Sequence, residues 1–143
     1  MTPAKKLVLD ANILIRAVLG IRVAALLNTY DDSVAFYTPA VCFDEARRNL
    51  PGIIASRRGD REVALKLLAE LQLIVEPVDQ AAYADLEQLA RERMAPRDIA
   101  DWPIAAVALM LGAPVWTEDR DFFGSGIATW TTDRVELYLQ GRS

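Results

Sequence analysis

The 143-residue sequence predicts an α/β fold, with a mostly parallel central sheet of four to five strands covered by helices on both faces. Short apolar runs of β-like composition alternate along the chain with longer stretches of helical periodicity. The composition, 52% hydrophobic and 25% charged, is typical of a globular protein with a core of its own. We therefore expect one domain spanning residues 1–143.

The first half of the chain contains three expected strands, at residues 6–9, 35–37 and 73–75. Helices are expected at 13–19, at 21–30, from Pro39 through Glu45, at 53–58 and at 61–72. Asn12 can cap the first helix, and Gly20 ends it. Pro39 suits a first helical turn, whereas Pro51, which is followed by glycine, should kink or break a helix. Pro77 should stop the third strand.

The second half continues the alternation with a helix at residues 80–93 and strands at 115–117 and 127–130. A helix begins beside Asp101, because Pro103 is tolerated only within a first turn, and it ends at Gly112. A closing helix covers residues 132–139. In such parallel folds, ligands bind beyond the carboxyl ends of the strands.

The residues that the chain lacks exclude several kinds of chemistry. There is no histidine, which removes Ser–His catalysis and the usual general base. Cys42 is the single cysteine, so no intrachain disulfide or thiolate zinc site is expected. No apolar run reaches the roughly 20 residues of a membrane span, and residues 7–9 are too short for a signal-peptide core. A cytoplasmic protein is expected.

Acidic residues stand at the element junctions where loops and helix starts meet. They are Asp10, Glu45, Asp98, Asp101, Asp119 and Asp121. Each has an ordinary explanation by itself: a turn or cap for Asp10 and Asp101, a solvent-facing pair of Glu45 with Arg48, and a charged surface loop for Asp119 and Asp121. Their coincidence in one βα pattern favours a shared pocket.

Several carboxylates without histidine indicate a hard divalent cation, magnesium or manganese. Crowded carboxylates repel one another unless a cation neutralises them. Such ions activate water for attack on a phosphorus atom and stabilise the departing oxygen. A metal-dependent phosphodiester-cleaving enzyme is therefore expected.

Arginine outnumbers lysine 13 to 3, which suits phosphate recognition, although the net charge is −4. Arg47, Arg48, Arg57 and Arg58 could bind flanking phosphates in a salt-dependent manner. A second arginine-rich segment follows at residues 91–97. Runs of charged residues usually form solvent-exposed faces, so each of these arginines could equally be an ordinary surface residue.

With these residues in view, the chain resembles the PIN-domain family, and within it the VapC-type toxin ribonucleases of bacterial toxin–antitoxin pairs. Four segments resemble the family's acidic motifs: Leu9-Asp10-Ala11-Asn12, Asp44-Glu45-Ala46-Arg47-Arg48, Asp101-Trp102-Pro103-Ile104, and Thr117-Glu118-Asp119-Arg120-Asp121. Asp98 fits the third motif less well than Asp101 does.

The resemblance implies a three-layer α/β/α fold and Mg²⁺- or Mn²⁺-dependent cleavage of RNA. It implies a metal-binding, catalytic quartet of Asp10, Glu45, Asp101 and Asp119, steadied by Asn12 and Thr117, with Asp121 as a further ligand. A homodimer and a small antitoxin partner are also implied.

Two other functions remain open. An aspartyl-phosphate enzyme would use Asp10 as its nucleophile. None of the three lysines follows a later strand, and position 12 is Asn rather than a second Asp, which argues against it. A non-catalytic RNA- or protein-binding module could keep the fold without the chemistry. Trp102, Trp116 and Trp130 could stack bases, but such residues more often belong to the core.

Overall fold

The computed structural model describes residues 5–141, and its centre is a five-stranded parallel sheet in the order β3-β2-β1-β4-β5. The strands are β1 (Lys5–Leu9), β2 (Val34–Pro39), β3 (Val75–Val78), β4 (Val115–Trp116) and β5 (Thr129–Trp130). Every neighbouring pair is parallel. The expected parallel sheet is confirmed.

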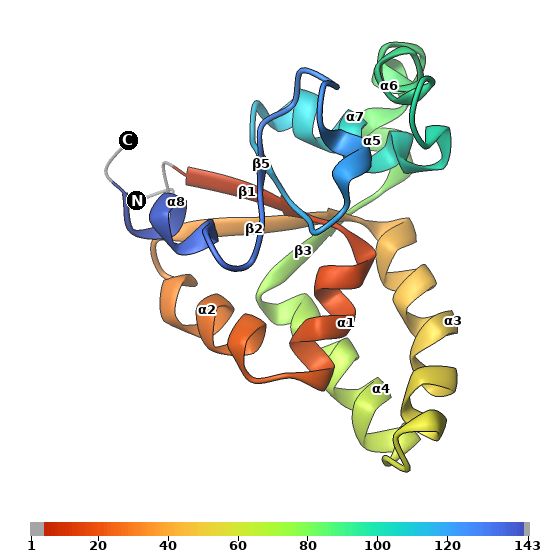
Figure 1. Cartoon of the computed structure of the whole chain (residues 1–143), viewed down its shortest axis with the longest axis vertical. Coiled ribbons are helices and arrows are strands. Elements are labelled where there is room, and N and C mark those ends of the chain that lie inside the picture. Colours follow the sequence, from red (N-terminus) through yellow and green to blue (C-terminus); the bar gives the residue numbers. More distant parts are fainter. Residues whose placement is uncertain (1–4, 142–143) are drawn as a thin grey trace.

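Helices cover both faces of this sheet (Figure 1). One face carries α1 (Ala11–Leu19), α2 (Arg22–Tyr30), α3 (Ala40–Ser56) and α4 (Arg61–Glu70). The other carries α5 (Gln80–Tyr83), α6 (Glu87–Met94) and α7 (Trp102–Leu111), and α8 (Val135–Gln140) lies near α2. Short 3-10 turns occur at Leu71–Leu73, Ala84–Leu86, Ile99–Asp101 and Arg120–Phe122. The α/β/α layering agrees with the sequence-based expectation.

Burial of the central strands explains their continuous apolar sequences. Leu7, Val8 and Leu9 of β1 are fully buried, since helices cover both sides of the sheet. Trp116 of β4 is also fully buried, and its indole N–H donates to the Thr132 hydroxyl at 3.0 Å. Trp102 is buried and Trp130 is partly buried against the core, so these indoles contribute mainly to packing.

The strand order reverses beside β1, and this reversal creates the crevice in which the acidic residues meet. From β1 the chain proceeds to β2 and β3 on one side, then crosses back so that β4 pairs with the other side of β1. Leu9 is in register with Trp116, the last residues of their strands. The segments after β1 and β4 therefore begin side by side at the carboxyl edge of the sheet, which is the usual place for ligand binding in open parallel sheets.

Several expected details of the elements are wrong. The break that Pro51 was expected to cause, as the alternative to a kink, does not occur: α3 continues through this residue, because Leu50 and Ile54 on either side are both buried in the core. The third strand is Val75–Val78 and includes Pro77, which an edge strand tolerates. The expected helix at 80–93 is interrupted by the 3-10 turn Ala84–Leu86.

Within residues 5–141, no single helix is long and apolar enough to cross a membrane. Two consecutive helices, α1 and α2, pass the same test only as a pair bent by 102°. Residues 1–4, on which the signal-peptide expectation partly rests, lie outside the described residues.

Candidate metal centre

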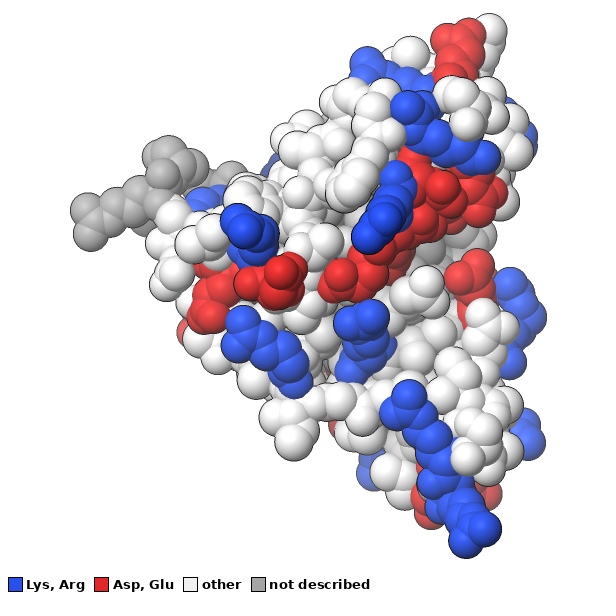
Figure 2. Space-filling model, in the orientation of Figure 1, with Lys and Arg blue, Asp and Glu red and all other residues white. Residues whose placement is uncertain are grey.

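The acidic residues converge on a pocket of about 410 Å³ beyond the carboxyl ends of β1 and β4. Figure 2 shows an acidic band running obliquely across this face, with basic side chains on both sides of it. The polar residues that line the pocket are Asp10, Asn12, Asp44, Glu45, Arg48, Gln80, Asp101 and Asp119. All four carboxylates of the expected quartet thus reach one cavity.

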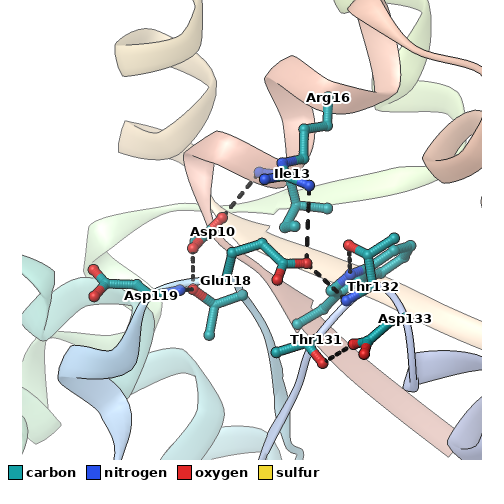
Figure 3. Close-up of polar contacts among 10 residues, drawn as sticks. Asp10, Ile13, Arg16, Glu118, Asp119, Thr131, Thr132 and Asp133 are labelled. Atoms are coloured by element: carbon teal, nitrogen blue, oxygen red, sulfur yellow. Dashed lines mark hydrogen bonds and ion pairs between the residues drawn. The ribbon is translucent and has the colours of Figure 1, made fainter.

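Asp10 is held rigidly where β1 ends and α1 begins. It is 5% exposed, and its Oδ1 accepts a hydrogen bond of 2.9 Å from the backbone N–H of Ile13, so Asp10 rather than Asn12 caps α1 (Figure 3). Burial raises the pKa of Asp10 from 3.8 to about 6, and the hydrogen bonds from Thr117 and Ile13 oppose this rise. The expected cap at Asn12 is wrong, and that exposed side chain lies at the pocket instead.

Thr117 connects the first and last acidic segments. Its hydroxyl donates to Oδ2 of Asp10 and accepts from the backbone N–H of Asp119 at 2.9 Å. The backbone N–H of Asp10 also donates to the Trp116 carbonyl at 3.3 Å. The pairing of β1 with β4 therefore determines where the Asp10 carboxylate lies relative to Asp119.

Asp101 lies at the start of α7 with its carboxylate uncommitted. It occupies the N-cap position, yet in the described chain its side chain accepts no hydrogen bond from the first turn of that helix. Burial and the negative charges of Asp98, Asp119, Asp10 and Glu45 raise the pKa of Asp101 to about 7. A carboxylate that is crowded by others and bonded to no local donor is well suited to a cation.

A second grouping shares Asp101. Carboxylate oxygens of Asp98, Asp101 and Asp121 all lie within 4.8 Å of one another. Asp98 also accepts from the backbone N–H of Ala100 at 3.0 Å, and the backbone N–H of Asp121 donates to Asp119 at 2.9 Å. The charge of Asp119 is the main cause of a raised pKa at Asp121. Asp98, the weaker motif match, therefore lies beside Asp101.

Glu45 and Arg48 of α3 are exposed and line the pocket. The expected Glu45–Arg48 ion pair is absent among residues 5–141, where Arg47 pairs instead with Asp44 at 2.7 Å. Arg48 lines the pocket.

The other two arginines of the expected phosphate-binding set lie elsewhere. Arg57 lines a separate groove together with Arg16 and Arg22. Arg58 adopts a left-handed backbone conformation, with φ of 55°. Of the four expected arginines, only Arg48 lines the pocket.

Sequence reasoning missed three polar residues that line this pocket, Cys42, Asp44 and Gln80. Burial raises the pKa of the Cys42 thiol to about 12, so without a metal the thiol stays protonated. Nothing in the sequence singles out Gln80. The remaining donors are carboxylate and amide oxygens, the ligand set that Mg²⁺ or Mn²⁺ prefers.

Comparisons with known proteins found one matching family model and several solved structures of similar fold. A family model described as "PIN domain" matches residues 8–140. No curated protein matches the sequence.

Solved structures share the fold. The chain has 15% identity and a TM-score of 0.67 to VapBC2 from Rickettsia felis bound to a DNA fragment from its promoter, covering 88% of this chain and 98% of that one. FitAB bound to the IR36 DNA fragment has 23% identity and a TM-score of 0.57, covering 88% and 94%. FitAcB from Neisseria gonorrhoeae has 21% identity and a TM-score of 0.57, covering 88% and 97%.

Proposed function

The chain belongs to the PIN-domain family, and on that premise we propose that it is a magnesium- or manganese-dependent endoribonuclease, the toxin of a toxin–antitoxin pair. One observation carries the proposal: in a chain without histidine, five carboxylates line one pocket, and the four of the expected quartet come from four separate segments. The nuclease domain would comprise residues 1–143.

Asp10, Asp101, Asp119 and Glu45 would hold the metal, with Asp121 as a further ligand. A bound divalent cation supplies activation of water and stabilisation of the departing oxyanion. Thr117 would keep Asp10 oriented toward the pocket, and Asn12 would support it from the exposed side. The raised pKa values of Asp10 and Asp101 mean that both become ionised near neutral pH, when they can serve as ligands.

The RNA backbone would meet Arg48 at the pocket, where a guanidinium can pair with a phosphate beside the scissile bond. Arg47, Arg57 and Arg58 would contribute weaker contacts farther along the strand. Because these contacts replace counterions, RNA affinity should fall as salt concentration rises.

The solved structures support a small antitoxin as the partner, since VapBC2 and FitAB are toxin–antitoxin complexes, each solved with bound DNA. We propose that this chain likewise pairs with an antitoxin that silences it, that it forms a homodimer, and that it acts in the cytoplasm.

The test is cleavage of a labelled, mixed-sequence single-stranded RNA by antitoxin-free protein, with Mn²⁺, with Mg²⁺ and with EDTA. Wild type should cut only with metal, and Asp10→Asn should not cut. Asp32→Asn removes an exposed aspartate outside the pocket and should cut as wild type does.

Retained cleavage by Asp10→Asn would refute the assignment. Folded wild type that binds RNA with or without chelator but never cuts it would indicate a binding module. Acid-stable, base-labile phosphorylation of the protein would indicate the aspartyl-phosphate reaction.

A further inference from the structure

Two arginines, Arg93 on α6 and Arg97 just beyond its end, donate hydrogen bonds to the loop that carries Asp119 and Asp121. We name residues 117–126 the acidic loop; it leaves β4 and passes through the 3-10 turn Arg120–Phe122. The Nε of Arg97 donates to the Phe123 carbonyl at 2.6 Å. A guanidinium nitrogen of Arg93 donates to the Ser125 carbonyl at 3.1 Å. Both arginines are half-buried, and each donates to a backbone carbonyl of the loop.

Two glycines make this close approach possible. Gly124 and Gly126 have φ values of +82° and +84°, in the left-handed region. A Cβ at Gly124 would overlap a guanidinium nitrogen of Arg97, and a Cβ at Gly126 would overlap one of Arg93. The loop backbone is thus shaped around the two guanidinium groups.

The fastened carbonyls directly follow the part of the loop that carries the carboxylates. Phe122 is 1% exposed and anchors the loop in the core, and the Ser125 hydroxyl donates back to the Phe122 carbonyl at 2.6 Å. Asp121 precedes this anchor by one residue. Its carboxylate lies within 4.8 Å of those of Asp98 and Asp101, which the segment just after Arg97 supplies.

We propose that Arg93 and Arg97 are positioning residues that hold the acidic loop against the end of α6 and the segment after it, and so keep the Asp121 carboxylate beside Asp98 and Asp101. The inference rests on the proposed function, in which these carboxylates serve a divalent cation. From sequence alone, the arginines at 91–97 could bind phosphates or face solvent. In the structure, Arg93 and Arg97 bond the backbone of the acidic loop.

The sign of the effect on Mn²⁺ affinity distinguishes this role from simple electrostatics. Arg97 is a cation near the carboxylates, and its charge lowers the pKa of Asp121. If charge alone mattered, removing Arg97 would strengthen Mn²⁺ binding. If Arg97 positions the loop, its removal weakens Mn²⁺ binding, on the order of 10-fold, as is common for residues that orient metal ligands.

The experiment measures Mn²⁺ binding by calorimetry and hydrogen exchange of the acidic loop in metal-free protein, for wild type and Arg97→Ala. We expect faster exchange and weaker Mn²⁺ binding in the variant. Arg97→Lys keeps the charge but loses the planar fork that bonds the Phe123 and Arg93 carbonyls together, so it should resemble Arg97→Ala. Arg61→Ala, on distant α4, controls for the loss of one arginine charge elsewhere on the protein.

Glycine variants test the same contact without deleting a charge. Gly124→Ala should displace Arg97, loosen the loop and weaken Mn²⁺ binding. Gly112→Ala is the matched control, because Gly112 also has a left-handed φ, +63°, but no atoms lie within 4 Å of its added Cβ. In an Arg97→Ala background, Gly124→Ala should have a smaller effect, since the overlapping group is gone.

Unchanged or stronger Mn²⁺ binding in Arg97→Ala would overturn the proposal, as would unchanged loop exchange. The outcome is separable from the proposed function. Wild type that binds Mn²⁺ without cutting RNA would refute the nuclease and leave the arginine contact standing. Wild type that binds no Mn²⁺ would refute the metal centre, and loop exchange alone would then decide whether the arginines hold the loop.

Discussion

Replacing Asp10 by Asn should stabilise the metal-free protein, and increasingly so as pH rises. Asp10 is 5% exposed, and its pKa is raised from 3.8 to about 6. A folded-state pKa above the unfolded value means that the folded protein binds the proton more tightly. This contribution to stability is fully present below about pH 4 and is lost as pH rises through about 6.

The magnitude follows from the size of that difference. A pKa raised by about two units corresponds to about 3 kcal/mol, because each unit is worth about 1.4 kcal/mol. Asn is nearly isosteric, stays neutral and can still accept the Ile13 N–H as a helix cap. The free energy of unfolding of Asp10→Asn minus that of wild type should therefore increase by about 3 kcal/mol between pH 4 and pH 7.

The assay is urea unfolding at several pH values in EDTA, with Asp32→Asn as the control whose difference from wild type stays flat. Saturating Mn²⁺ should reverse the order at pH 7, since a ligand bound only by the folded wild type stabilises it. A difference that is independent of pH in EDTA would refute the argument that buried Asp10 is ionised at a cost to the fold.

Three further outcomes are expected. Thr117→Val removes the donor to Asp10 and the acceptor for the Asp119 N–H, so it should lower the free energy of unfolding by about 2 kcal/mol. Losing the Thr117 hydroxyl should also raise the pKa of Asp10 further, and the acidic limb of the pH profile of RNA cleavage should then move to higher pH. The Tyr83 hydroxyl is buried and has no hydrogen-bond partner among the described residues. Thermal unfolding of Tyr83→Phe should therefore show unchanged stability or a gain of up to about 1 kcal/mol. A clear loss of stability would reveal a partner such as buried water. Leu9→Ala leaves a cavity at the fully buried centre of the sheet and should lower the free energy of unfolding by about 2–5 kcal/mol, as urea unfolding would show. Leu73 is exposed, so Leu73→Ala should lower it only a little.

The parallel sheet and the location of its acidic edge could be predicted from local sequence. Buried central strands are continuously apolar, as residues 7–9 are, and the residue after such a strand must emerge at the sheet's carboxyl edge. Asp10 and Asp119 follow β1 and β4, so their convergence required only that these strands be neighbours. The start of α7 beside Asp101 was equally local, since Pro103 is tolerated only in a first turn.

Where local preference competes with packing, only the tertiary structure decided. Pro51 lies inside α3 because Leu50 and Ile54 are buried together, and Pro77 lies within β3 because that strand is at the sheet edge. Neither the burial of Leu50 and Ile54 nor the edge position of β3 can be deduced from the residues near each proline. The cap of α1 is different, because the bond from the Ile13 N–H to Asp10 spans only three residues and a cap was one of the explanations that the sequence offered for Asp10.

Side-chain partnerships across the molecule were the least visible from sequence. Asp121 lies beside Asp98 and Asp101, and Arg93 and Arg97 bond carbonyls 26 to 32 residues away. Both arrangements depend on how residues 93–101 pack beside the acidic loop. The sequence determined which chemical groups the protein has and at which edge of the sheet they emerge. The packing of helices on that sheet determined which of them touch, because contact distances depend on tertiary geometry and not on spacing along the chain.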